Sequence, residues 1–372
     1  MKMKADPSIP VAQVVDAQII DYAEEGTNVM PPPAPFYVSE EQKKSWLRKS
    51  GIFPEGIVER FRKSCEDIAI RYWVIDNSGS MSASDGHRFI MEGNDRGRFV
   101  SSTRWEELCD SVEFHASVAA NLGAPTQFRL LNQPSGCPLN INVGYGQPLQ
   151  EMAEIRNLIA SSPLGRTPLC QRIKEIIYEI RDVEQQLRAN NKHALIVIAS
   201  DGEPSDGDVE QALRPLRDLP VWVVVRLCTE EDSVVDFWNE VDTDLELQMD
   251  VLDDVAGEAK EVHDHNSFLT YGLPLHRLRE WGCTDKIFDV IDEQKLTLPQ
   301  VQHLVSLIYG PVADDLPHPE LNWKKFLKQL KKIQTTDPTG GLVFDPLTKR
   351  SSFWFNLRRL NHLYGHGTCH LM

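Results

Sequence analysis

The stretch Tyr72-Trp73-Val74-Ile75-Asp76-Asn77-Ser78-Gly79-Ser80-Met81 joins four apolar residues to one carboxylate and two hydroxyl side chains at alternate positions. The apolar residues predict a buried β-strand that ends at Ile75. In the turn that follows, side chains two positions apart are able to meet at one point outside the edge of the sheet. Oxygen ligands of this kind suit a hard cation such as Mg²⁺ or Mn²⁺.

Two later segments place further oxygen-bearing side chains in comparable contexts. In the turn-rich stretch 161–167, Thr167 stands directly before Pro168, which is suited to the first turn of a long helix. The apolar run 194–199 predicts a second buried strand, and Asp201 follows it at the start of a glycine turn. We therefore expect three separate loops to contribute oxygen atoms to one site.

The polar residues of these three segments match, in sequence order, the metal-ion-dependent adhesion site of von Willebrand factor A domains. They are Asp76, Ser78, Ser80, Thr167 and Asp201. The chain resembles this family over Ile68–His265. The resemblance implies that the Asp-x-Ser-x-Ser group forms the first metal-binding loop, the threonine the second and the last aspartate the third. It also implies that an Asp or Glu side chain of a partner protein completes the coordination of the ion.

The segments between these motifs alternate between strand and helix patterns. Strands are predicted at 126–131, 140–143, 221–227 and 247–252, and helices at 103–122, 149–160, 168–190, 208–218, 231–241 and 255–263. Thr103 and Glu106 have the spacing of a capping box. Alternation of this kind favours a doubly wound α/β fold, in which a mostly parallel central sheet is flanked by helices. Ligands of such sheets bind beyond the carboxyl ends of the strands, where the loops at 76–81 and 201–204 are expected.

The stretch 81–102 departs from the family pattern, because it separates the first loop from its helix by more residues than the family commonly has. It contains Asp85, His87, Glu92 and Asp95. A long polar loop beside a binding crevice is typical of a lid or a selectivity surface. A solvated insertion without contact to the metal is the alternative.

Three parts of the chain differ in composition. Residues 1–38 contain a Pro-rich stretch and little periodicity, which predicts a disordered or extended segment. Residues 39–270 are predicted to form the α/β domain, with short helices at 39–49 and 55–64 in front of its first strand. Residues 271–372 predict a small all-α extension. Its helices are expected at 273–281, 285–293, 298–308, 322–333 and 352–363.

Charge is distributed unevenly between these parts. Residues 321–372 hold nine Lys and Arg against two Asp and Glu, a net charge of about +7, whereas the whole chain carries −16. The predicted helix at 322–333 combines an apolar stripe with five lysines, which is typical of an amphipathic helix with a solvated face. The same basic face also suits an anionic membrane surface, docking onto the acidic domain or, least favoured, nucleic acid.

Composition favours a cytoplasmic globular protein, a scaffold or a complex subunit, over an extracellular adhesion protein. No apolar run has the length of a membrane span or the position of a secretory signal. The seven cysteines are scattered, which favours reduced thiols over a disulfide framework.

From these patterns we expect a cation-dependent protein-interaction module and no enzymatic activity. An adaptor that binds membranes or assembles complexes through its basic helix is one alternative. A metal-dependent hydrolase is another, but hydrolases that start from a strand-end aspartate generally carry a second carboxylate two residues later, and here that residue is Ser78. The chain also has no Walker loop and no Gly-x-Ser-x-Gly elbow.

Overall fold

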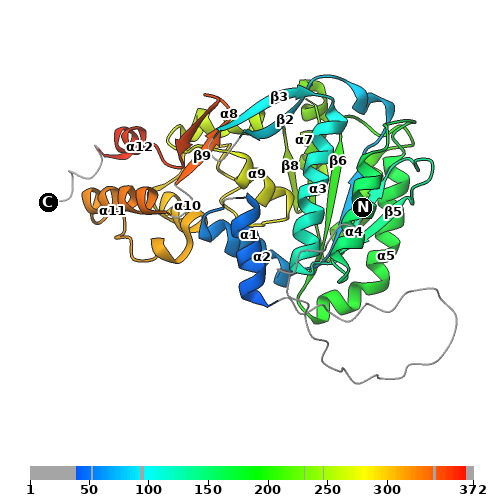
Figure 1. The fold of residues 1–372 in the computed structure, drawn as a ribbon, viewed down its shortest axis with the longest axis horizontal. Coiled ribbons are helices and arrows are strands. Elements are labelled where there is room, and N and C mark those ends of the chain that lie inside the picture. The colour runs from blue at the N-terminus through cyan, green and yellow to red at the C-terminus, as the bar shows by residue number, and fades with distance from the viewer. Residues whose placement is uncertain are drawn as a thin grey trace, which may run out of the picture. The chain divides into compact units, whose positions relative to one another are not determined.

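A six-stranded β-sheet lies at the centre of the computed structural model, which describes residues 39–365 except 52, 93–95, 230, 246 and 338–340 (Figure 1). The strand order is β5-β4-β1-β6-β7-β8, and only β4 and β5 pair antiparallel. The strands span Ile68–Ile75 (β1), Thr126–Leu130 (β4), Asn140–Val143 (β5), His193–Ser200 (β6), Val221–Leu227 (β7) and Met249–Leu252 (β8). The predicted mostly parallel sheet is thus confirmed, whereas the segment predicted at 1–38 lies outside the described residues.

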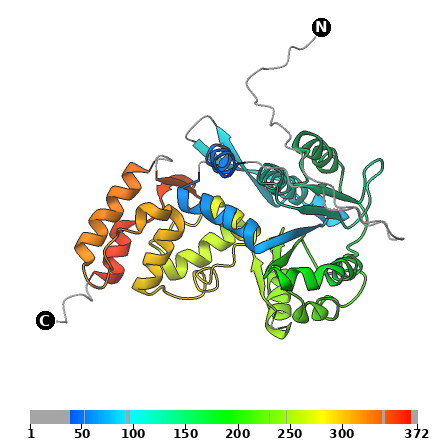
Figure 2. The same cartoon turned by 90° about the horizontal axis from the view of Figure 1, so that it is seen from below.

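Helices cover both faces of the sheet (Figure 2). They are α3 (Arg104–Leu122) and α4 (Pro148–Ile159) on one face, and α5 (Leu169–Ala189), α6 (Val209–Leu213) and α7 (Asp232–Leu245) on the other, with α8 (Val255–Asn266) after β8. Along β1, Trp73 and Ile75 face the core under α3, whereas Tyr72 and Val74 face the core under α5. Side chains of a strand alternate between its faces, so a continuous apolar strand fills two cores at once.

Most predicted elements of the α/β part are present, and their ends shift by a few residues. The capping box at the start of α3 is confirmed, because the side chains of Thr103 and Glu106 each accept a hydrogen bond from the backbone amide of the other. The helix predicted at 208–218 divides into α6 and the 3₁₀ helix η2 (Arg214–Asp218). Pro215 explains the division, since proline cannot donate the helical hydrogen bond and disturbs the turn before it.

The remaining elements pack beside the sheet (Figure 1). They are α1 (Glu40–Gly51), α2 (Glu55–Asp67), α9 (Leu273–Glu280), α10 (Leu298–Tyr309), η3 (Gly310–Ala313), α11 (Trp323–Thr336), β9 (Leu342–Asp345), β10 (Arg350–Phe353) and α12 (Leu357–Tyr364). Helix α2 contacts both α9 and α10. The C-terminal extension is therefore mostly helical, but it is not all-α, because β9 and β10 pair as an antiparallel hairpin. The Asp345 side chain closes that hairpin by accepting the Leu347 amide at 2.9 Å.

One predicted helix of this extension, at 285–293, is replaced by a run of turns. The buried side chain of Asn266 gives a physical reason. Its amide nitrogen donates to the carbonyl oxygens of Ile291 at 2.8 Å and Gln294 at 2.9 Å, and its oxygen accepts the Leu296 amide at 3.0 Å. These tertiary hydrogen bonds compete with the backbone pattern that a helix needs.

The apolar core runs from the sheet into the C-terminal extension. Trp281 is fully buried, and its indole nitrogen donates to the Phe61 carbonyl at 3.0 Å. The Arg71 guanidinium lies 3.8 Å from the centre of the Trp281 ring. All described residues belong to one compact unit. The predicted boundary between residues 270 and 271 stays a prediction.

Two further observations concern the class of protein. The six cysteines within the described residues are all free thiols, as predicted, and Cys369 lies outside this part. None of the helices in the described part of the chain combines the length and the apolar character needed to cross a bilayer.

A buried charge network joins α9 to α3 and β7. The fully buried Glu280 carboxylate lies 2.7 Å from Arg277 Nη1, 3.3 Å from Arg226 Nε and 2.8 Å from His115 Nε2. Burial by itself raises the pKa of Glu280, but the Arg277 charge and the His115 hydrogen bond hold that pKa well below its usual value. Burial lowers the pKa of His115 to about 4, so the imidazole is neutral at neutral pH.

Replacing Glu280 by Ala should reduce the free energy of unfolding by about 3–5 kcal/mol, because the buried Arg277 guanidinium loses its carboxylate partner and the buried Arg226 keeps only Glu107. Urea unfolding followed by circular dichroism measures this change. Glu66→Ala is the matched control, since Glu66 is 60% exposed and pairs with Arg62 on the same helix. Its effect should stay within about 1 kcal/mol. Equal stability losses for the two variants contradict the importance of the network.

Candidate functional site

Three loops meet beyond the carboxyl ends of β1 and β6. Asp76 follows β1 and Asp201 follows the neighbouring parallel strand β6. The Asp76 amide still donates to the Ala199 carbonyl at 2.9 Å, so the sheet ladder holds the first loop in place. From the second loop, the Leu164 amide donates to the Asn77 carbonyl at 2.7 Å. The loops at 76–81 and 201–204 thus lie at the predicted edge of the sheet.

The second loop is also tied to the other two. The Gly79 amide donates to the Gly165 carbonyl at 3.2 Å, while Thr167 and Ser205 exchange two hydrogen bonds of 3.1 and 2.9 Å. Gly165 has a φ of +88°, and a Cβ atom there would lie 2.6 Å from the Asn132 side chain. Only glycine fits this position without strain. The turn that presents Thr167 therefore depends on Gly165.

Four of the five predicted ligands form one chain of hydrogen bonds. The Ser78 and Ser80 hydroxyl oxygens lie 2.9 Å apart, and the Ser80 hydroxyl donates to Asp201 Oδ1 at 2.9 Å. The Ser78 amide donates to Asp76 Oδ1 at 2.8 Å. Within the described residues, no hydrogen bond is found for the half-buried hydroxyl of Thr167. The structure thus brings together Asp76, Ser78, Ser80 and Asp201. It places Thr167 on the adjoining loop.

Two acidic residues that follow Asp201 accept hydrogen bonds from backbone amides. Asp206 accepts the amides of Cys170 at 3.0 Å and Gln171 at 2.8 Å, at the start of α5. Asp208 accepts the Gln211 amide at 3.0 Å and caps α6. The two Asp206 contacts hold the third loop against α5, which begins two residues after Thr167.

Asp76 is the most deeply buried of the predicted ligands, and its second oxygen accepts the Ser200 hydroxyl at 2.6 Å. Burial raises the pKa of Asp76, the hydrogen bonds from Ser200 and Ser78 lower it in part, and the negative charge of Asp201 raises it further. A divalent cation beside such a carboxylate stabilises the ionised form and reverses this increase.

Arg104 is a charged residue of this site that the sequence did not indicate. Its buried guanidinium lies 3.0 Å from Asp201 Oδ2, 2.8 Å from Asp85 Oδ1 and 2.8 Å from Glu231 Oε1. The hydrogen bond to Asp85 is the main reason why the pKa of Arg104 is raised. In the sequence this residue is only a cation in the first turn of a predicted helix, so no local pattern distinguishes it from a solvated one.

The stretch 81–102 is not an irregular loop. After η1 (Gly79–Ser82), the strands β2 (Gly86–Glu92) and β3 (Arg96–Ser102) pair as an antiparallel hairpin, which Figure 1 shows reaching toward β9. The rings of Phe89 and Phe99 on this hairpin lie 4.9 and 5.6 Å from the ring of Phe344 on β9. The hairpin is therefore packed, and Asp85 at its base reaches the site through Arg104.

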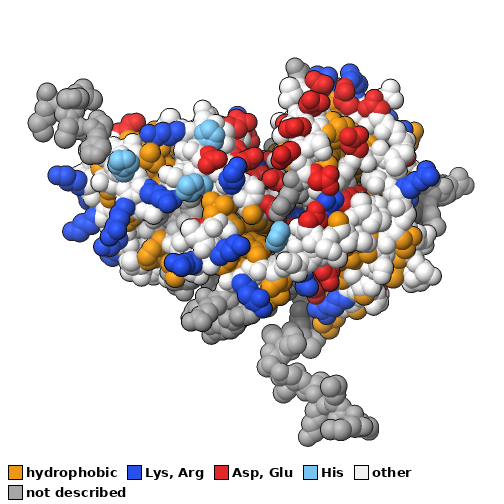
Figure 3. Space-filling model, turned by 90° about the horizontal axis from the view of Figure 1, so that it is seen from above, with side chains coloured by type: hydrophobic (Ala, Val, Ile, Leu, Met, Phe, Trp, Pro, Cys, Tyr) orange, Lys and Arg blue, Asp and Glu red, His pale blue; other side chains and the backbone are white. Residues whose placement is uncertain are grey.

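Acidic side chains gather on the face around the carboxyl ends of the strands, as Figure 3 shows. At the candidate site, the exposed acidic residues include Asp85, Glu203 and Glu231. Farther away, the carboxylates of Glu258, Glu261 and Asp292 have oxygen atoms within 4.8 Å of one another, but Arg279 is paired with two of these residues. That second group is therefore a structural ion-pair cluster, whereas the rim of the candidate site carries an excess of negative charge.

Comparisons with known proteins give little additional information. No protein-family model matches the chain, and no curated protein matches its sequence. Among solved structures, the chain is similar to the conserved hypothetical protein BatB from Bacteroides thetaiotaomicron, with 12% sequence identity and a TM-score of 0.30. The match covers 57% of this chain and 99% of BatB. The fold assignment rests on strand order and helix placement, because a similarity at this level carries no weight for the site.

Arg104→Gln should lower the free energy of unfolding by about 3 kcal/mol, because it leaves the buried Asp201 carboxylate without its guanidinium partner. Thermal and urea unfolding in the absence of divalent cations measure the loss. Arg88→Gln is the control, since Arg88 pairs with Asp110 where the two side chains are 37% and 32% exposed. That substitution should cost no more than about 1 kcal/mol. A similar small cost for Arg104→Gln contradicts the role assigned to Arg104.

Proposed function

We propose that the chain is a von Willebrand factor A-type module that binds a protein partner through Mg²⁺ or Mn²⁺. The ion would be held by Asp76, Ser78, Ser80, Thr167 and Asp201. An Asp or Glu side chain of the partner completes the coordination shell. The proposed role is binding and not catalysis.

The spacing of the site oxygens is the observation that carries this proposal. Ligands of an octahedral Mg²⁺ lie about 2.1 Å from the ion, so neighbouring ligands are separated by about 3 Å. The distances from Ser78 to Ser80 and from Ser80 to Asp201 are both 2.9 Å. Because hydroxyl groups rotate freely, the same oxygens are able to turn their lone pairs toward a cation without movement of the backbone.

The charges of the site support a partner-dependent function. Two carboxylates offset at most the two charges of a divalent cation, and Arg104 already offsets part of the charge of Asp201, so the site with its ion would keep a net positive charge. The ion therefore retains affinity for one more anionic ligand. Without the ion, the acidic rim would repel a partner carboxylate. Binding of the cation and of the partner should accordingly be coupled.

Ser78→Ala combined with Ser80→Ala should weaken Mn²⁺ binding by more than about tenfold, because two of the proposed oxygen ligands are lost. Isothermal titration calorimetry, with and without a short acidic peptide, measures this effect. The matched control is Ser233→Ala combined with Ser351→Ala, which removes two exposed hydroxyls elsewhere. Unchanged Mn²⁺ binding in the first variant would falsify the proposed site.

The same two variants test the partner. Affinity capture from lysate should retain a protein in Mg²⁺ and release it in EDTA, and only the Ser78/Ser80 variant should fail to capture it. Mass spectrometry then identifies the retained protein. Capture that survives both EDTA and the double substitution is incompatible with a cation-dependent contact.

Mn²⁺ affinity should also depend on pH, because a proton and the cation compete for the Asp76 carboxylate. The pKa of Asp76 is raised. Protonation therefore begins nearer to neutral pH than for an ordinary aspartate, and affinity should fall as the pH is lowered through this range. Calorimetric titrations at a series of pH values measure the dependence. A constant affinity from neutral to distinctly acidic pH argues against Asp76 as a ligand.

A further inference from the structure

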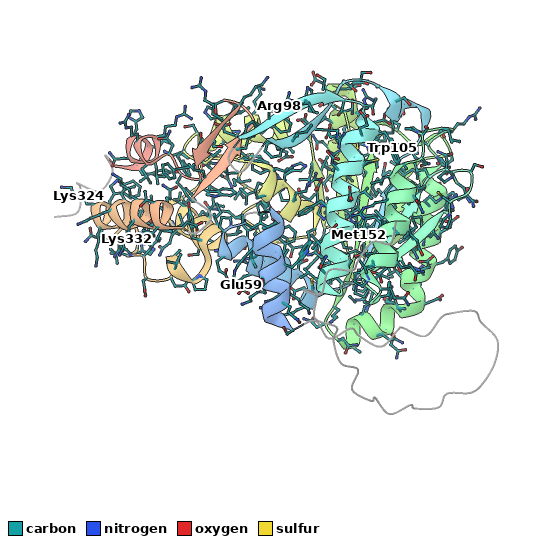
Figure 4. All side chains as sticks on the ribbon, viewed as in Figure 1. Glu59, Arg98, Trp105, Met152, Lys324 and Lys332 are labelled. Carbon is teal, nitrogen blue, oxygen red and sulfur yellow. The ribbon has the colours of Figure 1, made fainter. Side chains whose placement is uncertain are left out.

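Helix α11 presents a face made of lysines. Its five lysine side chains are exposed: Lys324, Lys325, Lys328, Lys331 and Lys332. The opposite stripe, which includes Trp323, Phe326 and Leu330, is buried in the protein core. Figure 4 labels Lys324 and Lys332 on this helix, at the end of the unit away from the six-stranded sheet. We call these five residues the lysine face.

The lysine face has no counter-charge of its own. Among the described residues, no ion pair is found for any of its five ammonium groups. Arg358, on the α12 helix that packs against α11, adds a further exposed positive charge. The chain as a whole has 55 Asp and Glu against 39 Lys and Arg, so an unpaired basic surface is unusual in this molecule. Such a surface attracts an extended array of negative charge.

We propose that the lysine face docks on an anionic lipid bilayer. Clusters of four to eight basic residues on an amphipathic helix are typical of surfaces that bind acidic lipid headgroups. Lysine suits this ligand because its ammonium is a compact charge without the directional demands of a guanidinium. Nucleic acid fits less well, since Trp323 and Phe326 are buried and unable to stack on bases.

The structure also defines how the helix would dock. Its apolar stripe is occupied by the protein core, so α11 lies on the headgroups and does not insert into the acyl chains. Leu321, two residues before the helix, is 86% exposed and supplies one apolar contact at the interface. The acidic rim of the metal site lies on the sheet-containing part of the same unit (Figure 3). Repulsion by the bilayer would turn that rim away, which leaves the site accessible to a partner.

The affinity should depend on acidic lipid, on salt and on the number of lysines. Each lysine near an anionic leaflet strengthens binding by roughly fivefold. Removing three charges from the lysine face should therefore weaken binding by about a hundredfold. High salt should have a similar effect, because it screens charges that interact through water.

Co-sedimentation of the full chain with vesicles tests the proposal. The vesicles contain phosphatidylcholine alone or with phosphatidylserine, and the variant combines Lys324→Gln, Lys328→Gln and Lys331→Gln. The control combines Lys174→Gln, Lys260→Gln and Lys286→Gln, which removes the same charge from exposed lysines on other elements. We expect the unmodified chain and the control to bind only the phosphatidylserine vesicles, and the lysine-face variant to lose this binding.

Several outcomes overturn the proposal. They are equal binding to both kinds of vesicle, equal losses in the two triple variants, and no binding by the unmodified chain at low salt. Lysine-dependent binding to an oligonucleotide, or lysine-dependent self-association measured by sedimentation velocity, in place of vesicle binding would assign the face to another ligand. The Ser78/Ser80 double variant should bind vesicles normally, so failure of the metal site and failure of the lysine face are distinguishable.

Discussion

Because β1 and β6 pair in parallel over most of their length, both strands end at the same edge of the sheet. This pairing places Asp76 beside Asp201, although 124 residues separate them in the chain. Two carboxylates held this close repel each other and favour a positive charge between or beside them. The hydroxyls of Ser80 and Ser200 and the guanidinium of Arg104 donate hydrogen bonds to these carboxylates, and the Ser78 hydroxyl is hydrogen-bonded to that of Ser80. The candidate site is thus a consequence of the sheet topology.

Arg104 also connects the site to the rest of the molecule. Through Asp85 it holds the base of the β2–β3 hairpin, and the hairpin packs by its phenylalanine rings against β9. A change at the candidate site that moved Asp201 would therefore meet resistance from a packed element. Contacts of this kind limit the freedom of the side chains around Asp201, and such preorganisation reduces the free energy that ordering costs when a ligand binds.

The C-terminal elements extend the same core and also carry the opposite charge. Trp281 and the Glu280 network bind them to α2, α3 and β7. The lysine face of α11 lies outside this network and is exposed to solvent. One compact unit thus presents an acidic surface around the candidate metal site and a basic surface on α11. The two surfaces suit ligands of different chemistry.

The sequence alone determined the six strands of the central sheet, most helices, the sheet type, the five candidate ligands and the basic face of α11. Each of these depends on local patterns, namely apolar periodicity, capping residues and the order of a short motif. Tertiary structure decided the hairpin at 86–102, the turns at 285–293, the hairpin at 342–353 and the ion pairs of Arg104. For the turns and the ion pairs, the deciding contact joins residues that are distant in the chain, such as Asn266 with Ile291 or Arg104 with Asp201, and the hairpin at 86–102 packs its phenylalanine rings on Phe344. Local patterns carry no information about such contacts, because the free energy that favours them appears only after the core has formed.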